Sequence, residues 1–295
     1  MLQGYLAIII AMLIWGSVGI FARMAAQDPL ITVTYRVLFA AAALGLTLLF
    51  QRRRAETTPA QAGSPQGLRR WLLLVFGGVA LATNWLFFFK AVATTTVTNA
   101  VLSYYAAPVL VALASPILLR EKLEGRTMLA TALAFGGVFV MLYQPGHTLS
   151  ATDVAGIGYG LVAACFYAMV TITARLLPDV SAATLVLVQC LSAVAILVPA
   201  VLATGGLHAL AMSAGALGLL AVIGVLHTAL ALFLYFWGLQ RVKVQHVGVL
   251  AYLDPVSAVL FAFLFLGEVP TGASLLGGGL VLAGSALLLK RQRET

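Results

Sequence analysis

Apolar side chains follow one another along this chain in ten long runs that are separated by short polar stretches. Each run is close to the roughly 20 residues that an α-helix needs to cross the hydrocarbon core of a bilayer. The runs are continuous and lack the alternation of apolar and polar positions that is typical of membrane β-barrels. The pattern predicts an all-α polytopic membrane protein with ten transmembrane helices, at Gly4–Arg23, Leu30–Phe50, Trp71–Ala91, Val97–Leu119, Arg126–Tyr143, Val154–Leu176, Ala182–Ala203, Ser213–Trp237, His246–Leu266 and Ala273–Leu289.

The fourth and ninth runs carry the same pattern. The segment LSYYAAPVLVALASPILLREKLEG begins at Leu102, and VLAYLDPVSAVLFAFLFLGEVPTG begins at Val249 and aligns with it without a gap, 147 positions later. The first and sixth runs match at a spacing of 152, over Gly4–Arg23 and Gly156–Arg175. Repetition of this kind indicates that one structural unit occurs twice. We predict one membrane unit made of two five-helix repeats, residues 1–145 and 146–295. The repeat aligns Tyr105 with Tyr252, Pro108 with Pro255 and Glu121 with Glu268.

Composition agrees with a lipid surrounding. The chain has 295 residues, of which 62% are hydrophobic and 9% are charged, against about 25% charged residues in a soluble domain. The net charge of +8 does not indicate a nucleic-acid partner, because the basic residues lie at the ends of apolar runs. Cys165 and Cys190 fall within predicted helices, where we expect them to pack rather than to form a disulfide. The first run lacks a preceding basic segment, so we expect a retained helix and not a cleaved leader.

Lys and Arg are distributed unevenly between the two predicted sides of the membrane. Fourteen of the 17 fall on the side of the N-terminus. Since Lys and Arg collect in cytoplasmic loops, we predict a bacterial inner-membrane protein with both termini in the cytoplasm. Five crossings per repeat would insert the second repeat upside down relative to the first. The flanking residues agree, because Glu121 lies between Arg120 and Lys122, whereas Glu268 follows Gly267 and has no basic neighbour.

Inverted repeats are typical of transporters whose two halves open a central site alternately to each side. The Trp15-Gly16 pair, the helices containing Pro108 and Pro255, and the segment Leu266–Glu268 together resemble the EamA family of the drug/metabolite transporter superfamily. The resemblance covers essentially the whole chain, and within the family the chain is similar to bacterial amino-acid exporters of the YddG type. It implies a central cavity lined by the first, third, fourth, sixth, eighth and ninth helices.

Polar and aromatic residues gather in those same helices. Polar side chains are costly in hydrocarbon unless they are bonded, so they tend to face a partner or a wet cavity. Deep aromatic rings suit stacking on an apolar or aromatic substrate. We predict no catalytic residue, no metal site and no cofactor. The candidates for substrate binding are Trp15, Ser17, Thr83, Asn84, Trp85, Asn99, Ser103, Tyr104, Tyr105, Tyr167, His227, Tyr252 and Asp254.

Some of these residues have a structural alternative. Asn84 and His227 can make an interhelical hydrogen bond instead of lining the cavity. Pro108 and Pro255 each remove a backbone hydrogen bond and bend the helix, which gives either a fixed bend or a pair of hinges for gating. Asp254 can bind a substrate ammonium or carry a proton, or it can cap the backbone that the neighbouring proline disturbs.

The other charges within the predicted spans are few. Arg36 and Lys90 lie near helix ends, and we expect their head groups to snorkel to the membrane surface. The first helix carries no acidic residue, whereas the resemblance implies that proton-coupled drug antiporters of the superfamily use one there. We therefore expect neutral or zwitterionic solutes moving by facilitated diffusion.

The predicted function is export of neutral or aromatic amino acids, or of related small metabolites, by alternating access. The expected partners are a small-molecule substrate and the lipid bilayer, with a monomer or a homodimer as the assembly. A proton-coupled drug, metabolite or nucleotide-sugar carrier is the alternative. An intramembrane enzyme is more remote, because the chain has neither an HExxH nor a GxSxG motif.

Overall fold

A computed structural model describes residues 2–55, 67–143, 149–205 and 211–289 of the chain. The described part is built from helices and short links, and ten of its helical segments are long and apolar enough to cross a membrane. Seven of these spans are single helices: α1 (Leu2–Ala25), α2 (Pro29–Ala55), α3 (Leu68–Thr94), α6 (Gly125–Leu142), α7 (Ala151–Arg175), α8 (Ala182–Gly205) and α13 (Gly272–Leu289). Three are composite: α4 (Val97–Tyr104) with α5 (Ala107–Leu118), α9 (Ala214–Val222) with η2 (Ile223–Leu230) and α10 (Ala231–Leu239), and α11 (Val244–Ala251) with α12 (Leu253–Leu266).

The ten predicted spans are confirmed, with differences at their ends. The second helix continues to Ala55 and the third begins at Leu68, so the link predicted at Gln51–Arg70 is shorter than expected. Its middle lies outside the described residues, as do the first half of the predicted link Gln144–Asp153 and the basic residues at 290–293.

The fourth and ninth spans are interrupted where the sequence predicted bends. Backbone turns at Tyr105 and Tyr252 separate the two halves of these spans. Each turn comes just before a proline, and Pro108 and Pro255 then lie in the first turn of the following helix. Proline is tolerated there because the first N–H groups of a helix have no partner within it. The break therefore occurs three residues before each proline.

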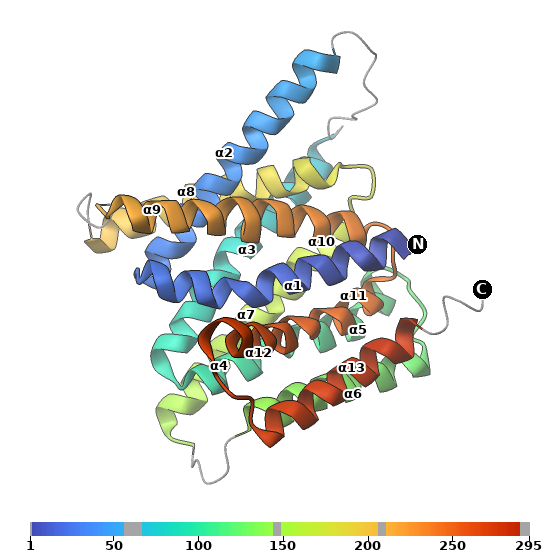
Figure 1. Cartoon of the computed structure of the whole chain (residues 1–295). Helices are drawn as coiled ribbons and strands as arrows, with labels where there is room; N and C mark the ends of the chain where they lie inside the picture. The colour runs from blue at the N-terminus through green and yellow to red at the C-terminus, as the bar shows by residue number, and fades with distance from the viewer. Residues whose placement is uncertain (1, 56–66, 144–148, 206–210, 290–295) are drawn as a thin grey trace.

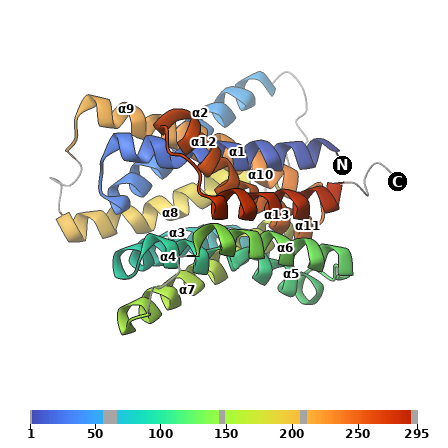
Figure 2. The ribbon, with the colours of Figure 1, turned by 60° about the horizontal axis from the view of Figure 1, so that its bottom comes forward.

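The helices pack mainly across the predicted boundary between the halves. α1 contacts α10 and α12, while α7 contacts α3, α4 and α5; α2 packs on α8, and α6 on α13. α1 begins and α13 ends at the same end of the bundle (Figures 1 and 2). This arrangement encloses a space between the first, second, third, fourth, sixth, eighth and ninth spans.

Glycine allows the closest of these helix contacts. A Cβ atom at Gly16 in α1 would overlap the hydroxyl of Ser257 in α12, and one at Gly160 in α7 would overlap that of Ser103 in α4. Small residues of this kind let transmembrane helices approach closely. The fifth and tenth spans use Gly137 and Gly277 to pack on each other within the protomer.

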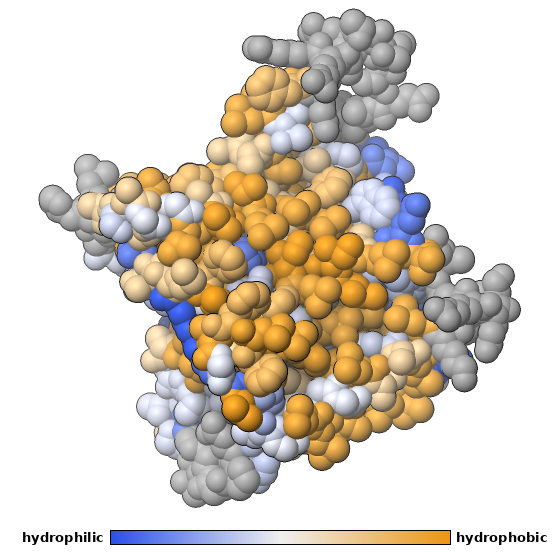
Figure 3. All heavy atoms as spheres, in the orientation of Figure 1, coloured by the Kyte–Doolittle hydropathy of each residue, from blue (hydrophilic) through white to orange (hydrophobic). Residues whose placement is uncertain are grey.

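The outer surface is as apolar as the composition suggests. Figure 3 shows hydrophobic side chains over most of the face in view, and large apolar residues such as Ile117 and Phe265 are exposed. Monomeric soluble proteins rarely expose so much contiguous apolar surface. The ten spans therefore have the surface expected of a multi-pass protein in a lipid bilayer.

Candidate cavity at the centre of the bundle

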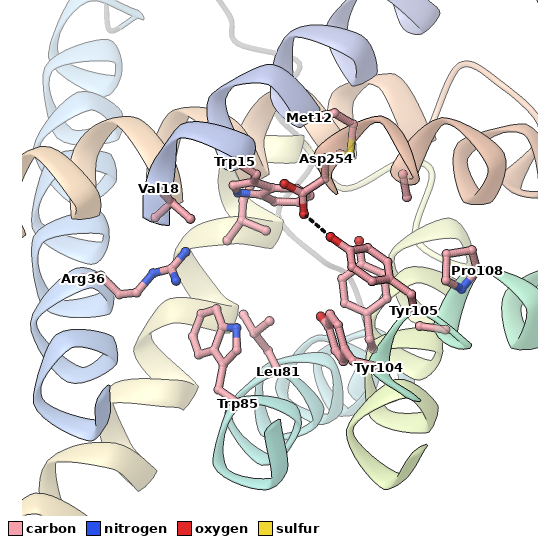
Figure 4. Close-up of a pocket in the computed structure, with 14 residues that line it drawn as sticks. Met12, Trp15, Val18, Arg36, Leu81, Trp85, Tyr104, Tyr105, Pro108 and Asp254 are labelled. Carbon is pink, nitrogen blue, oxygen red and sulfur yellow. Dashed lines mark hydrogen bonds between the residues drawn. The ribbon is translucent and has the colours of Figure 1, made fainter. Parts of the chain in front are cut away.

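A cavity with about 800 Å³ of space, its open mouth included, lies among the central helices. Figure 4 shows the side chains that surround it. Five are aromatic, two are charged and seven are small or aliphatic. The aromatic residues are Trp15, Trp85, Tyr104, Tyr105 and Tyr167, the charged ones are Arg36 and Asp254, and the others are Met12, Val18, Leu81, Ala107, Pro108, Leu232 and Ala251.

The aromatic side chains form a connected wall. Tyr104 packs against Tyr167, with ring centroids 5.8 Å apart, and against Phe88 of α3 at 4.9 Å. Trp15 of α1 packs against Tyr235 of α10, with ring centroids 5.4 Å apart. Aromatic pairs in this range stabilise one another beyond the area they bury. The wall therefore holds a fixed shape and offers ring faces to a bound molecule.

The prediction that the Arg36 side chain snorkels to the membrane surface is wrong. The guanidinium of Arg36 points into the cavity from α2 (Figure 4) and lies 5.2 Å from the ring centroid of Trp85. Nε donates to the hydroxyl of Thr228 at 2.9 Å, and Nη2 lies 3.5 Å from the carbonyl oxygen of His227. A positive charge is thus placed in the wall of a largely apolar cavity.

The π-helical segment η2 explains how Arg36 is held there. In a π-helix each backbone bond spans one residue more than in an α-helix, and such segments are frequent at functional sites. The carbonyl oxygen of His227 accepts from Trp15 Nε1 at 2.8 Å as well as facing Arg36. Thr228 donates its own hydroxyl to the Ile223 carbonyl at 3.1 Å. One wide turn therefore orients two cavity residues, an aromatic ring and a cation.

Asp254 lies in the opposing wall, at the start of α12. Tyr105 donates its hydroxyl to Asp254 Oδ2 at 3.1 Å (Figure 4). Tyr252, the repeat counterpart of Tyr105, donates to the Tyr105 carbonyl oxygen at 2.9 Å. The two tyrosines at the helix breaks thus meet, and one of them orients the carboxylate. Tyr252 itself is buried behind the wall and is not among the lining residues.

Several predicted site residues support the wall and do not line it. Asn84 is buried and donates to the Ala163 carbonyl oxygen at 2.7 Å, which is the interhelical alternative. His227 is buried as well, with Nε2 2.9 Å from the Ser17 hydroxyl. The carbonyl oxygen of His227 contacts Trp15 and Arg36. Ser17 and His227 therefore help to position cavity residues without lining the cavity themselves.

The remaining polar candidates are used in their own helices or at helix ends. The hydroxyl of Thr83 donates to the Val79 carbonyl oxygen, and that of Ser103 to the Asn99 carbonyl oxygen. The Asn99 amide donates to Thr95 at 3.0 Å. None of Thr83, Asn99 and Ser103 is among the residues that line the cavity.

Comparisons with known proteins find a family model and several relatives that match most of the chain. A model of the EamA-like transporter family matches residues 2–143 and 154–290. The chain is 30% identical to an uncharacterized transporter, YxxF, of Bacillus subtilis, over 97% of this chain and 89% of that one. It is 28% identical to an uncharacterized transporter of Archaeoglobus fulgidus, over 96% and 95% of the two chains, and 26% identical to the protein RarD of Salmonella typhi, over 91% and 88%.

The fold is also found in a solved structure. A protein crystal structure superposes on this chain with a TM-score of 0.82, covering 98% of both chains at 20% sequence identity. Identity this low shows that the fold is shared, and carries no information about substrate.

Proposed function

Since the chain belongs to the EamA-like transporter family, we propose that its central cavity carries neutral or aromatic amino acids, or related small metabolites, across the membrane. One observation carries this proposal. The cavity lies among the membrane-spanning helices and joins an aromatic wall to one cation and one anion. Ligand sites generally combine an apolar lining with a few placed polar groups in this way. Trp15, Trp85, Tyr104, Tyr105, Tyr167 and Asp254 are the substrate-binding residues of the proposal.

We further propose that the chain is an inverted repeat, with halves 1–145 and 146–295, and that it works by alternating access. The helix contacts support this, because each contact of span one has a counterpart made by span six. The ion pairs support it as well. Glu121 of the first half pairs with Arg175 of the second at 3.5 Å, and Glu268 of the second half pairs with Arg23 of the first at 2.8 Å. Glu121 aligns with Glu268, and Arg23 with Arg175.

The proposed orientation places both termini in the cytoplasm of a bacterium, in its inner membrane. The uneven distribution of Lys and Arg along the sequence supports it. The proposed assembly is a monomer or a homodimer. In this orientation the end of the bundle with Glu121 faces the cytoplasm, and the end with Glu268 faces outward.

Facilitated diffusion is the proposed mode of transport, and a proton-coupled carrier is the second candidate. Asp254 favours the second, because it is a carboxylate in the cavity wall that a proton can reach. A pH gradient across the membrane separates the two, since only a coupled carrier would concentrate substrate against its own gradient.

Transport by purified protein in liposomes tests the proposed function. We expect a panel of labelled amino acids to include members that equilibrate faster than across protein-free vesicles, with aromatic and large neutral side chains ahead of small or charged ones. If no amino acid in the panel moves faster than in protein-free vesicles, the proposed substrate class is wrong.

A further inference from the structure

The cavity wall contains two opposite charges that do not pair with each other. Of its 14 lining side chains, Arg36 and Asp254 are the charged ones. No ion pair within 4 Å joins them or links either of them to another residue that the structure describes. A cavity with one cation and one anion has no net charge, which favours a ligand that also has none.

The protein leaves part of each charge unsatisfied. The guanidinium of Arg36 has five N–H donors, and its hydrogen bonds to the described residues are those to Thr228 and the His227 carbonyl oxygen. Among the described residues, the Asp254 carboxylate accepts one hydrogen bond, from the Tyr105 hydroxyl to Oδ2. In the described part of the chain no backbone N–H donates to this carboxylate, so it is not a helix cap. Both groups keep hydrogen-bonding capacity on the cavity side.

A charged side chain in the wall of a largely apolar cavity is stabilised by a partner of opposite charge. Removing an ion from water into a largely apolar site is expensive unless an opposite charge and hydrogen bonds replace the water. Truncating one member of a hydrogen-bonded charge pair at a binding interface leaves the other charge unpaired and weakens binding. A ligand that supplies an anion to Arg36 and a cation to Asp254 would satisfy both groups at once.

We propose that Arg36 and Asp254 recognise the two ends of an amino-acid zwitterion, the carboxylate at Arg36 and the ammonium at Asp254. This inference rests on the proposed function and sharpens it from small metabolites to zwitterions. The side chain of the amino acid then lies against the aromatic wall of Trp15, Trp85 and Tyr104, whose ring faces accept apolar and aromatic groups alike. Selection by the two charges accounts for recognition of the amino-acid backbone, and the wall accounts for preference among side chains.

Competition experiments in proteoliposomes test this directly. The probe is counterflow of labelled phenylalanine, and the competitors are unlabelled phenylalanine, phenethylamine, which lacks the carboxylate, and 3-phenylpropionate, which lacks the ammonium. We expect each truncated competitor to be roughly tenfold weaker or worse, as is typical when a hydrogen bond to a charged group is lost. If either competitor matches phenylalanine, the two-charge recognition is wrong although the transport function stands. If phenylalanine and every other amino acid fail to show counterflow, the proposed function itself has failed.

Two variants then assign each charge to its end of the ligand. Arg36→Gln should weaken phenylalanine by roughly tenfold while leaving competition by phenethylamine unchanged, because that molecule has no group for Arg36. Asp254→Asn should weaken phenylalanine and leave 3-phenylpropionate unchanged. Equal weakening of all three competitors by either variant would show a structural role and overturn the assignment.

Matched controls come from an exposed ion pair. Arg70 and Asp179 lie 2.9 Å apart at the surface, with side chains 43% and 67% exposed. Arg70→Gln and Asp179→Asn remove the same chemical groups far from the cavity, and both should leave all three competition curves unchanged. The wild-type competition needs no variant, so it decides the proposal even if a cavity variant fails to fold.

Discussion

The half-helices α4 and α11 occupy matching positions in the two predicted repeats, yet their surroundings differ. Val97–Tyr104 aligns with Val244–Ala251 at the spacing of 147. All eight residues of α11 are buried, whereas only Ala100 and Ser103 of α4 are. α11 packs on α5, but α4 makes no comparable contact with α12 among the described residues. The bundle is therefore closed at the α11 end and open at the α4 end.

The ion pairs at the two ends differ in the same sense. At the α11 end, Glu121 and Arg175 have side chains only 15% and 27% exposed, and Glu121 also accepts from the Val244 N–H at 3.2 Å. At the α4 end, Arg23 and Glu268 form a single pair with side chains 70% and 54% exposed. Exposed pairs contribute about 0–1 kcal/mol, and buried ones are costly to break. The α11 end is therefore stabilised by a partly buried ion pair and a hydrogen bond that share Glu121. The α4 end has one weak, exposed ion pair.

Breaking the network should have the largest effect on this difference. Glu121→Gln removes the charge that faces Arg175 and weakens the bond to the Val244 N–H. We expect the equilibrium between the closed and open forms of the α11 end to shift toward the open form by about 2 kcal/mol, which is roughly thirtyfold in the ratio of open to closed molecules. The measurement is labelling of Val244→Cys by a bulky polar maleimide, in a background without Cys165 and Cys190. An unchanged labelling rate in a folded variant would show that this network does not hold the end closed.

Removing the aromatic wall should have the next largest effect. Tyr104 aligns with Ala251, so Tyr104→Ala gives α4 the residue that α11 has at this position. The change deletes the ring contacts with Phe88 and Tyr167, and we expect transport of phenylalanine to fall about tenfold with expression retained. Trp85→Ala should act in the same direction. Transport at the wild-type rate in both variants would exclude the wall as a substrate-binding surface.

The prolines should have a smaller and unequal effect. Alanine restores an N–H and removes the clash that bends the helix, so we expect Pro108→Ala and Pro255→Ala each to slow transport about fivefold by disfavouring one of the two conformations. Pro108 lines the cavity and lies against Gly248, whereas Pro255 is not a lining residue. Competition by phenylalanine should therefore weaken in Pro108→Ala only. Wild-type transport rates in both variants would mean that the bends are fixed packing features and not hinges.

The smallest effect is expected at the open end. Glu268→Gln breaks an exposed pair with Arg23, which is worth less than about 1 kcal/mol. Labelling at Val244→Cys and transport should both stay within about threefold of the parent protein. This variant is also the matched control for Glu121→Gln, because the two glutamates align in the repeat. A response as large as that of Glu121→Gln would remove the contrast between the two ends.

The sequence was sufficient to predict the spans and the helix breaks. Continuous apolar runs determine which segments cross the membrane, and Pro108 and Pro255 interrupt the backbone bonding wherever they fall in a span. The aromatic members of the cavity were also predictable, because Trp15, Trp85 and Tyr104 are large rings deep in spans that the family resemblance placed around a cavity.

The direction in which a side chain points was not predictable in the same way. A helix that is apolar on every face has no polar stripe to show its rotation, so Asn84 and Asn99 could not be separated from true lining residues. Arg36 was misread because its position near a helix end suggested snorkelling. Its inward orientation depends on Thr228 and the His227 carbonyl oxygen in η2, which come from a distant part of the chain. The signal available in the sequence was the position of Arg36 within a predicted span, because ionisable residues in spans usually face the protein interior or a water-filled cavity.

Cysteine labelling at the two aligned positions Val97 and Val244 tests alternating access most directly. Val97 is 62% exposed and Val244 is fully buried, so Val97→Cys should be labelled at least about tenfold faster in the absence of substrate. Adding a transported amino acid to both sides should slow labelling at Val97→Cys and speed it at Val244→Cys. Rates that do not change, or that change in the same direction at both positions, would contradict a cavity that opens to one side as it closes to the other.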